Sequence, residues 1–553
     1  MAERDTGRGS GRDAGQDDGR DTGRVDGGSA VAVHRRTWRL EDVTVADPEA
    51  MRRSVTGTAV GNFMEWYDFG VYAYLATVIA QVFFPSGASG TASLIGTFGI
   101  LAASFLVRPL GGFVLGPLGD RIGRRRVLMV TITLMACATT ATGLLPGYDS
   151  WGPWGSGIGF WAAILLLVTR MVQGFSTGGE YVGAMTYIDE HAPDRRRGFL
   201  AGFLPVGTLS GYICGAALVT GLTAGLSQDA MLAWGWRIPF LLGGPLGLVA
   251  LYMRLRLQET PAFEKLTEEE KAGSEGGGAQ QFRQTVVEQW PRLLVCMGLV
   301  LTFNVTNYML SGYLPTYLES IASLSSTVAL VIVTAVMLVL AAAVLFVARL
   351  SDAVGRKPVM WTGCGLLVVA SIPAFALMRS GEHLVVFLGV LIVGIMLLCF
   401  NSTEPSTLPA LFPTNVRYGA LAVAFNISVS AFGGTTPLIS EGLVSWTGNE
   451  MMPAYVLIVA GIVGIVCVFF TPETARRRLP GGSPTVATDD EARYVAETGT
   501  IEDPGESAGG ITETEAGTEN TENTENTVGR EGPEGPDGTE GPDGTEGTER
   551  ERR

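Results

Sequence analysis

GDRIGRR, at residues 119–125, recurs as SDAVGRK at residues 351–357, so that Asp120 and Asp352 lie 232 residues apart. Each copy follows an apolar block and combines an acidic residue, a glycine and basic residues. Two further pairs of motifs follow in the same order: APDRRRG at 192–198 with FPTNVRYG at 412–419, and ETP at 259–261 with PET at 472–474. Three repeats in one order are hard to obtain by chance. The sequence therefore predicts a chain built from two similar halves.

Apolar blocks fill most of the chain between and around these motifs. A helix needs roughly 20 residues to cross the hydrocarbon core of a bilayer. Blocks of that kind lie near residues 55–84, 93–117, 127–146, 160–188, 199–224, 237–256, 292–319, 327–348, 358–378, 384–411, 419–444 and 453–471. We therefore predict an all-α membrane protein with about twelve transmembrane helices in two six-helix halves.

The charge of the chain is concentrated at its C-terminal end. The formal net charge is -15, and residues 479–553 alone hold 20 acidic residues against 5 arginines, so the remainder sums to zero. This charge describes the tail and gives no reason to expect a nucleic-acid partner. We predict a disordered cytoplasmic arm at 1–50, a first half at 51–257, a cytoplasmic linker at 258–290, a second half at 291–475 and a disordered acidic tail at 476–553.

Basic residues occur in every second connection between the apolar blocks, which indicates the cytoplasmic side of a membrane protein. The connections between them carry almost no charge: residues 86–92 have none, and residues 147–159 have only Asp149. The basic connections contain Arg121 and Arg124, then Arg195 and Arg197, then Arg356 and Lys357, then Arg417, and finally Arg476 and Arg478. We expect a multi-pass protein of the plasma membrane with both termini in the cytoplasm.

Two carboxylates, Glu65 and Asp68, interrupt the apolar sequence GNFMEWYDFGVY at residues 61–72. They are three residues apart and so share one helix face. A charge inside a bilayer is costly and indicates a functional site. The other charged residues of the first half that we place within the spans are Arg108, Arg170 and Glu180. Counting along the helices puts Arg108 and Glu180 at a similar depth of ~12 Å, so we expect them to face each other.

A carboxylate that gains and loses an arginine partner can take up and release a proton. The predicted proton-coupling residues are Asp68, Glu180, Glu65, Arg108 and Arg170. Asp68 lies deepest and is the better candidate, whereas Glu65 is a candidate for a structural role. The sequence leaves a second interpretation open, in which these residues form permanent ion pairs that only specify helix packing.

Neutral polar and aromatic residues dominate the centre of the second half, whose spans contain no Lys or Arg away from their borders after Arg292. A carrier of di- or tricarboxylates would surround its substrate with cations. Neutral groups beside aromatic rings instead suit a zwitterion, whose ammonium can rest on a ring face. The predicted substrate-binding residues are Trp66, Tyr67, Tyr72, Gln173, Tyr181, Asn304, Asn307, Tyr308, Glu404 and Asn426. Each aromatic residue taken alone is better explained by packing, and only the whole set supports a binding site.

Glu404, followed by Pro405, lies inside an apolar block where only small or neutral residues are expected. Three roles remain open for it from the sequence. These roles are to bind the ammonium end of a solute, to form a second proton site, or to face a water-filled vestibule.

Several motifs together resemble the metabolite:proton symporter branch of the major facilitator superfamily, and later segments resemble the carriers of proline and glycine betaine within it. The resemblance implies two parallel six-helix halves with a substrate site between them. The motifs are GDRIGRRR, RMVQGFSTGGEY at 170–181, EHAPDRRRG, WGWRIPF at 234–240, and LQETPAF at 257–263, followed by NVTNYML, TLPALFPTNVRYGALAVAFNIS and MMPAY. It further implies proton symport of a small zwitterionic osmolyte into the cell.

The same resemblance implies a cytoplasmic gate, in which charged groups of the repeated loops hold the two halves together in one state of the transport cycle. The expected gate residues are Gly119, Asp120, Arg121, Gly123, Arg124, Asp352, Gly355 and Arg356. Anchoring the topology of the chain is the simpler role for the same arginines.

Other functional classes have weaker support. The three histidines lie outside the spans or at their borders, and the six cysteines lie far apart in apolar segments. We therefore expect no enzyme, no cofactor and no metal. The expected partners are a small-molecule substrate, protons and the lipid bilayer, and the oligomeric state stays open. A symporter of an organic acid such as shikimate or a keto acid is favoured if Arg108 and Arg170 face the cavity unpaired. A non-transporting membrane osmosensor is the alternative of another class.

Overall fold

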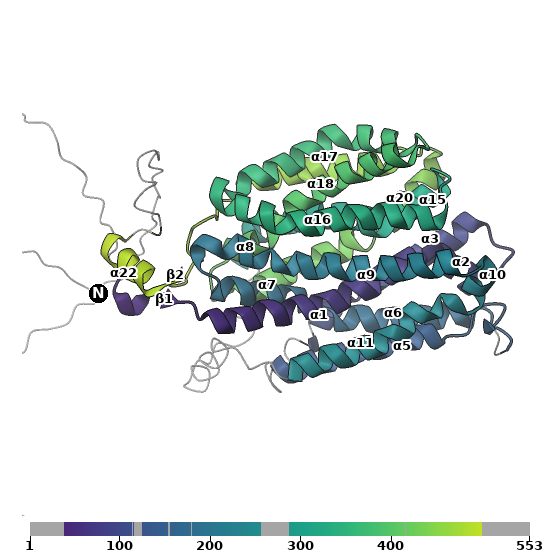
Figure 1. The fold of residues 1–553 in the computed structure, drawn as a ribbon, viewed down its shortest axis with the longest axis horizontal. Coiled ribbons are helices and arrows are strands. Elements are labelled where there is room, and N and C mark those ends of the chain that lie inside the picture. The colour runs from purple at the N-terminus through teal and green to yellow at the C-terminus, as the bar shows by residue number, and fades with distance from the viewer. Residues whose placement is uncertain are drawn as a thin grey trace, which may run out of the picture. The chain divides into compact units, whose positions relative to one another are not determined.

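The computed structural model describes residues 38–112, 114–115, 124–152, 155–178, 180–255, 287–414, 416–499 and 501. These residues are almost entirely helical, and the long helices run side by side (Figure 1). The predicted linker at 258–290 lies mostly outside the described residues, as do residues 1–37 and 502–553 of the predicted arms.

The first half contains the helices that precede the linker. Its elements are α1 (Pro48–Tyr74), α2 (Ala76–Phe83), α3 (Gly90–Leu106), α5 (Arg124–Leu144), α6 (Trp161–Ser176), α7 (Glu180–His191), the turn η3 (Asp194–Arg196), α8 (Arg197–Ala201), α9 (Phe203–Gly225), α10 (Gln228–Ala230), η4 (Met231–Gly235) and α11 (Arg237–Leu255).

The second half repeats this pattern of long helices joined by short turns. Its elements are α14 (Trp290–Tyr308), η6 (Met309–Tyr313), α15 (Leu314–Ser320), α16 (Ser326–Val354), α17 (Arg356–Met378), α18 (His383–Thr407), η7 (Pro409–Leu411), α19 (Arg417–Ser428), η8 (Val429–Gly433), α20 (Thr436–Thr447) and α21 (Met452–Phe470).

The predicted apolar blocks each correspond to one of these helices or to consecutive helices. Within the described residues, eight helices are long and apolar enough to cross a membrane. The remaining blocks correspond to α1 with α2, to α5, to α6 with α7, and to α11. Large apolar side chains are exposed on the outer faces, including Phe346 at 71%, Val369 at 74% and Trp446 at 84%. An apolar exterior of this kind is suited to lipid.

Helix ends and breaks differ from the sequence prediction for local reasons. α1 begins at Pro48 rather than near residue 55, because the Asp47 side chain accepts a hydrogen bond from Glu49 N and proline occupies the first helical position. The predicted single block at 160–188 is two helices, α6 and α7, separated by residues 177–179 with the sequence TGG.

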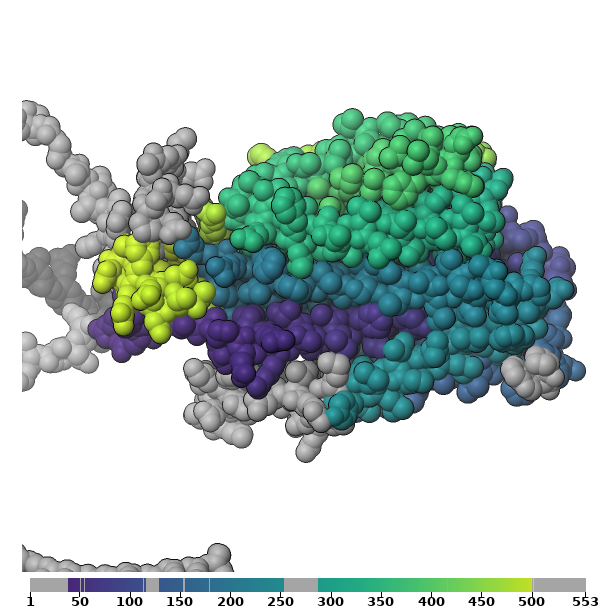
Figure 2. Space-filling view, viewed as in Figure 1, coloured from purple at the N-terminus to yellow at the C-terminus, as the bar shows by residue number. Residues whose placement is uncertain are grey.

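The two halves pack against each other along α9 and α16, and further contacts join α3 to α20 and α7 to α19. Figure 1 shows α16 and α9 side by side, and Figure 2 shows the second half, in green, lying alongside the first half, in blue and purple. We call the end of the bundle at which α1 begins and α21 ends the terminus end, and the opposite end the far end.

A small folded unit lies at the terminus end, formed by residues 38–47 and 479–499. In it, β1 (Thr44–Val45) pairs in parallel with β2 (Thr485–Val486), and α22 (Asp489–Thr498) packs on the pair. Four apolar side chains form its core: Val43, Val486, Ala492 and Val495. We call this unit the terminal clasp. The prediction that residues 1–50 and 476–553 are disordered is wrong for these segments.

The terminal clasp is bonded to both halves. Asp194 Oδ2 of the first half accepts a hydrogen bond from Thr485 N at 3.0 Å, and Arg197 Nη1 donates to Arg477 O at 2.9 Å. In the second half, Arg417 Nη2 donates to Pro480 O at 2.9 Å. The segment that follows α21 therefore bridges the two halves.

Close helix packing in the first half depends on glycine. A Cβ atom at Gly174 of α6 would overlap the backbone of Ser104 in α3, whereas a Cβ at Gly221 of α9 would meet nothing within 4 Å. Small residues at helix interfaces let membrane helices approach closely.

Replacing Gly174 by leucine should separate α3 from α6 and destabilise the first half by about 1–3 kcal/mol, because the interface has no room for a side chain. Thermal unfolding of the purified protein in detergent measures this. Gly221→Leu is the matched control and should unfold at nearly the wild-type temperature; an equal loss in both variants would contradict the packing argument.

Candidate functional site

Two buried ion pairs hold the face of α1 that carries the acidic residues. Glu65 Oε1 accepts from Arg108 Nη2, and Asp68 Oδ2 accepts from Arg170 Nη1 at 3.2 Å. All four side chains are almost completely inaccessible. We expected Arg108 to face Glu180; the structure pairs it with Glu65 instead.

Aromatic rings surround both guanidinium groups. The Arg108 guanidinium carbon lies 4.9 Å from the Phe69 ring centre and 4.6 Å from that of Phe105. The Arg170 guanidinium carbon lies 4.2 Å from the Tyr72 ring centre. Such contacts stabilise cations that are removed from water. Tyr72 is therefore a partner of the ion pair, and its hydroxyl donates to Thr97 O rather than to a solute.

Gln173 also belongs to the Asp68 pair. Its amide nitrogen donates to Asp68 Oδ2 and, at 2.6 Å, to Thr139 Oγ1. Even so, Asp68 Oδ1 and two nitrogens of Arg170 have no hydrogen-bond partner among the residues that the structure describes. Buried polar groups are nearly always satisfied, so this pair retains capacity for another proton or donor.

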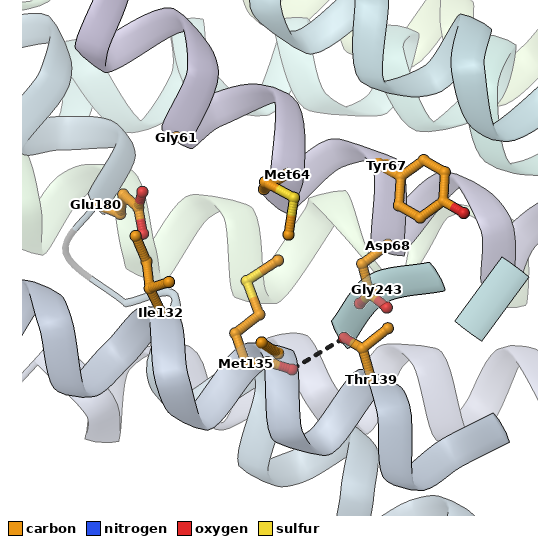
Figure 3. A pocket seen from close by; sticks show the side chains of 10 residues that line it. Gly61, Met64, Tyr67, Asp68, Ile132, Met135, Thr139, Glu180 and Gly243 are labelled. Atoms are coloured by element: carbon orange, nitrogen blue, oxygen red, sulfur yellow. Dashed lines mark hydrogen bonds between the residues drawn. The ribbon is translucent and has the colours of Figure 1, made fainter. Parts of the chain in front are cut away.

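A cavity of about 10 Å³ adjoins Asp68, which is about the space that one water molecule occupies. Asp68 and Glu180 both line it, together with Met64 and Met135. Figure 3 shows Glu180 on one side of this cavity and Asp68 on the other, with the two methionines between them. Two of the predicted proton-coupling residues thus share one small cavity.

Tyr67 lines the same cavity, but its hydroxyl donates to Pro239 O at 2.9 Å. This bond ties α1 to α11. The structure therefore separates the Tyr67 hydroxyl from the aromatic group around Trp66, although Tyr67 and Trp66 were both predicted to bind substrate.

Trp66 is the centre of an aromatic cluster at the interface between the halves. Its ring centre lies 6.2 Å from that of Tyr181, 5.5 Å from that of Tyr212 and 5.9 Å from that of Tyr308. Tyr181 in turn stacks on Phe425 at 5.1 Å. The sequence analysis named Trp66, Tyr181 and Tyr308 but missed Tyr212 and Phe425.

Polar groups with unused hydrogen-bonding capacity lie on the second-half helices α14 and α18. Within the described part of the chain, Asn304 Oδ1 and Tyr308 OH on α14 have no hydrogen-bond partner, and neither do Asn401 Nδ2 and both carboxylate oxygens of Glu404 on α18. All four residues are buried. Unsatisfied groups at these positions are suited to a ligand that supplies the missing partners.

The other predicted polar residues already have partners. Asn307 Nδ2 donates to Tyr212 OH at 3.4 Å, and Asn426 Nδ2 donates to Gly178 O at 2.5 Å. Both bonds cross from the second half to the first. These residues therefore hold the halves together in this state.

The predicted gate residues of the second half lie at the terminus end. Asp352 accepts hydrogen bonds from the backbone N–H groups of Gly198 and Phe199 at 2.9 and 2.8 Å, so it caps α8 of the first half. Arg356 Nη1 donates to Ser406 O at 2.8 Å, and its Nη2 lies 3.5 Å from Asp352 Oδ1. Gly355 has a φ of 103°, which favours glycine.

The corresponding residues of the first half cannot be compared. Gly119, Asp120, Arg121 and Gly123 lie outside the described residues, and Arg124 is described only as the first residue of α5.

Glu473 of the PET motif caps the helix that begins at Arg356. It accepts from Arg356 N and Lys357 N at 3.0 Å each. Burial raises the pKa of this carboxyl, but backbone N–H donors outweigh burial and hold the pKa below its usual value. The stabilisation is therefore present at neutral pH and is lost as the pH falls through the lowered pKa.

The second pair of motifs has the same geometry in both halves. Arg197 Nε donates to Asp189 O and Arg417 Nε donates to Pro409 O, each eight residues earlier and at 3.1 Å. Both arginines are buried. From the sequence, these arginines were interpreted as charges that set the membrane topology. In the structure each one also closes a turn, because its Nε bonds a backbone carbonyl eight residues earlier. Arg417 Nη1 also donates to Glu190 Oε1 across the halves at 2.9 Å.

A two-half helical membrane bundle with ionisable residues buried between its helices is an architecture that secondary transporters use. Residues 55–481 match the family model described as Sugar (and other) transporter. The chain is 42% identical over 460 residues to the glycine betaine/proline/ectoine/pipecolic acid transporter OusA of Dickeya dadantii (strain 3937), covering 82% of this chain and 90% of that protein. It is 41% identical over the same length to the proline/betaine transporter of Escherichia coli (strain K12), with the same coverage.

Among solved structures, the proton:xylose symporter XylE of the major facilitator superfamily matches with a TM-score of 0.62. The identity is 18%, and the match covers 78% of this chain and 98% of that one. This likeness concerns the fold alone. The chain belongs to the Sugar (and other) transporter family, and its fold is like that of a symporter of the major facilitator superfamily. It is a membrane transporter rather than an enzyme, and the predicted fold class is confirmed.

Removing the Asp352 carboxylate with Asp352→Ala should loosen the terminus end, because the N–H groups of Gly198 and Phe199 lose their acceptor. Spin labels on the exposed positions Thr56 and Val354, in a variant without native cysteines, should report a longer mean distance.

Glu450→Gln is the control for this prediction. It breaks the half-exposed pair with Arg379, 2.7 Å long, at the far end and should leave the label distance unchanged. An unchanged distance in Asp352→Ala would refute the gate contact.

Proposed function

We propose that this transporter imports a small zwitterion such as glycine betaine or proline together with a proton. The observation that carries the proposal is the aromatic cluster around Trp66, which lies between the halves beside unsatisfied neutral groups of α14. A quaternary or secondary ammonium gains about 0.5–2 kcal/mol on such ring faces. Relatives that are 41–42% identical over 82% of the chain are transporters of proline and betaine, which supports the same substrates for this protein.

The organic-acid alternative has less support. A symporter of organic acids would need Arg108 and Arg170 to face the cavity unpaired. Both arginines instead contact carboxylates on α1, so neither is a ready binding site for a substrate anion.

Proton coupling is assigned to the Asp68–Arg170 pair. Protonation of Asp68 removes the negative charge that holds Arg170, and a contact made in only one protonation state shifts a conformational equilibrium. The unsatisfied Asp68 Oδ1 and the adjoining water-sized cavity give the proton an acceptor and an approach from the side of Glu180. Glu65, whose partner Arg108 also donates from Nε to Thr177 Oγ1 at 2.9 Å, has a structural role in this scheme.

The terminus end is assigned to the cytoplasm of a cell whose plasma membrane holds the bundle. The basic residues Arg195, Arg356 and Arg417 all belong to connections at this end. A basic excess on one side of a membrane protein indicates the cytoplasmic side. Asp352 and Arg417 then close the inner face of the transporter.

Uptake into proteoliposomes tests the function directly. Labelled glycine betaine, proline and shikimate should be compared with and without an imposed proton gradient. We expect accumulation of glycine betaine or proline that depends on the gradient. Uptake of neither would refute the substrate, uptake of shikimate would favour the organic-acid alternative, and uptake that ignores the gradient would refute the coupling.

Asp68→Asn should abolish gradient-driven accumulation while exchange of internal for external solute continues, because the amide mimics the protonated carboxyl but releases no proton. The double variant Asp68→Asn with Arg170→Gln separates coupling from packing, since it removes both charges of the pair. Under the proton role the double variant still fails to accumulate solute. Restored accumulation would show that the pair serves only to match two buried charges.

Trp66→Leu should weaken solute binding by roughly 2- to 30-fold, the equivalent of one lost cation–π contact, while Trp66→Phe loses less. The measurement is the KM for uptake or the Kd for binding. Trp446→Leu, a change at an exposed position of the second half, is the control and should bind like the wild type. Equal affinity in Trp66→Leu would remove the ring from the site.

A further inference from the structure

Asn62 is a buried amide on α1, one turn before Trp66, and it is the hydrogen-bond partner of that ring. Trp66 Nε1 donates to Asn62 Oδ1 at 2.7 Å, and Asn62 is only 3% exposed. On its other side, Asn62 Nδ2 donates to Leu204 O at 2.9 Å and to Thr208 Oγ1 at 2.6 Å, both on α9. The indole of Trp66 is therefore tied to α9 through one side chain.

Only one orientation of the Asn62 amide fits these partners. An amide donates from its nitrogen and accepts at its oxygen, and an indole can only donate. The reversed amide would place its NH₂ group against the Trp66 N–H and its oxygen against Leu204 O. Neither Asn62 nor Trp66 is left with an unsatisfied buried side-chain atom within the described part of the chain. A buried polar network that is fully satisfied is rigid.

Glycines on α9 bring the two helix backbones close enough for this short side chain to reach across. A Cβ atom at Gly207 would overlap the backbone of Ala59, and a Cβ at Gly211 would overlap the backbone of Phe63. On α1 these two contacts lie on either side of Asn62. Small residues one turn apart let membrane helices approach closely. The close approach is therefore a condition for the bonds that Asn62 makes to α9.

The same packing fixes the mutual geometry of two rings of the aromatic cluster. The ring centres of Trp66 and Tyr212 lie 5.5 Å apart, with an angle of 51° between the ring planes. Tyr212 lies one turn after Thr208 on α9, just as Trp66 lies one turn after Asn62 on α1. Both rings belong to the first half, whereas the contact of Trp66 with Tyr308 crosses to the second. We therefore expect Trp66 and Tyr212 to move together when the halves separate.

The bond to Asn62 also decides what Trp66 can offer to a solute. An indole has a single hydrogen-bond donor, and here that donor is already used. The Tyr212 hydroxyl is likewise engaged, because it accepts from Asn307 Nδ2 at 3.4 Å. What remains of Trp66 is its ring face, which attracts a cation and has no donor for a carboxylate. This side of the site suits the ammonium end of a zwitterion.

We propose that Asn62 is a positioning residue of the solute site, which holds the Trp66 indole so that its ring face, and not its N–H, meets the ammonium end of the solute. This inference rests on the proposed function and adds which end of the zwitterion faces the first half. Asn62 acts through Trp66. Without the amide, the Trp66 N–H would be a buried donor with no acceptor, which is unfavourable, so the ring would turn and its face would leave the ammonium.

Binding of two solutes to the purified full chain, measured by titration calorimetry, tests the inference. Glycine betaine is compared with tert-butylacetate, a carbon isostere that has the same shape without the positive charge. Asn62→Leu, which removes the amide and nearly keeps its volume, should weaken glycine betaine binding by about 2- to 10-fold and lower the preference for glycine betaine by a similar factor. A loss of packing alone would weaken the binding of both solutes equally.

A double-mutant cycle with Trp66→Phe separates positioning from a general structural role. Phenylalanine keeps a ring face but has no N–H for Asn62 to hold. In the Trp66→Phe background, Asn62→Leu should therefore change the affinity for glycine betaine by less than about 2-fold. Equal losses in the two backgrounds would overturn the positioning role.

Thr302→Val is the matched control for Asn62→Leu. It removes another buried hydrogen bond between helices, from Thr302 Oγ1 on α14 to Ala460 O on α21 at 3.0 Å. This variant should keep the wild-type preference for glycine betaine over tert-butylacetate. An equal fall in preference in Thr302→Val and Asn62→Leu would show a general effect of lost bonds and would overturn the inference.

The outcomes separate this inference from the function on which it rests. Wild-type protein that binds neither glycine betaine nor proline refutes the proposed function. Wild-type protein that binds glycine betaine, with an unchanged preference in Asn62→Leu, overturns the role of Asn62 alone. If Asn62→Leu does not fold, Thr208→Val decides, because it removes one of the two bonds from Asn62 to α9. The preference for glycine betaine should fall in this variant, and an unchanged preference overturns the positioning role.

Discussion

A charge inside an apolar bundle must be matched, and this requirement fixes how the first half is assembled. Glu65 and Asp68 lie on one face of α1, and their partners come from two other places in the half, Arg108 just after α3 and Arg170 on α6. Removing one partner of a buried pair typically costs about 3–5 kcal/mol. The two pairs therefore fix the orientation of α1 about its own axis. In that orientation Trp66 faces Tyr308 of the second half.

The two pairs differ in how far their arginines are satisfied within the described residues, and this difference is the reason that proton coupling is proposed at the Asp68–Arg170 pair. Arg108 donates to Glu65 and Thr177 and lies between two aromatic rings. Asp68 and Arg170 leave buried atoms without partners and adjoin a small cavity. A satisfied network is rigid, whereas an incomplete one can exist in two protonation states. The same contrast recurs in the second half, where Asp352 is fully engaged and Glu404 is not.

The sequence predicted the two halves because repetition of motifs such as GDRIGRR and SDAVGRK does not depend on knowing the fold. It also identified the buried charges, because Asp68, Arg170 and Glu404 stand out in apolar segments. It paired Arg108 with the wrong acid because depth counted along a helix contains no information about rotation. Tyr212 and Phe425 were missed since an aromatic residue in an apolar helix leaves no pattern. The clasp was missed because two-residue strands have no periodicity and α22 begins with three acids.

The pairing of Thr44 with Thr485 joins a segment that precedes the first helix of the bundle to a segment that follows its last helix. β1 leads directly into α1, and Thr485 of β2 is bonded to Asp194, so both strands are attached to the first half, while Arg417 of the second half is bonded to Pro480 in the segment before β2. If the halves rock apart at this end, the displacement therefore acts on the bond between Arg417 and this segment rather than on the strand pair. The clasp then stays with the first half, and its contact with Arg417 resists small excursions and must break before this end of the bundle can open.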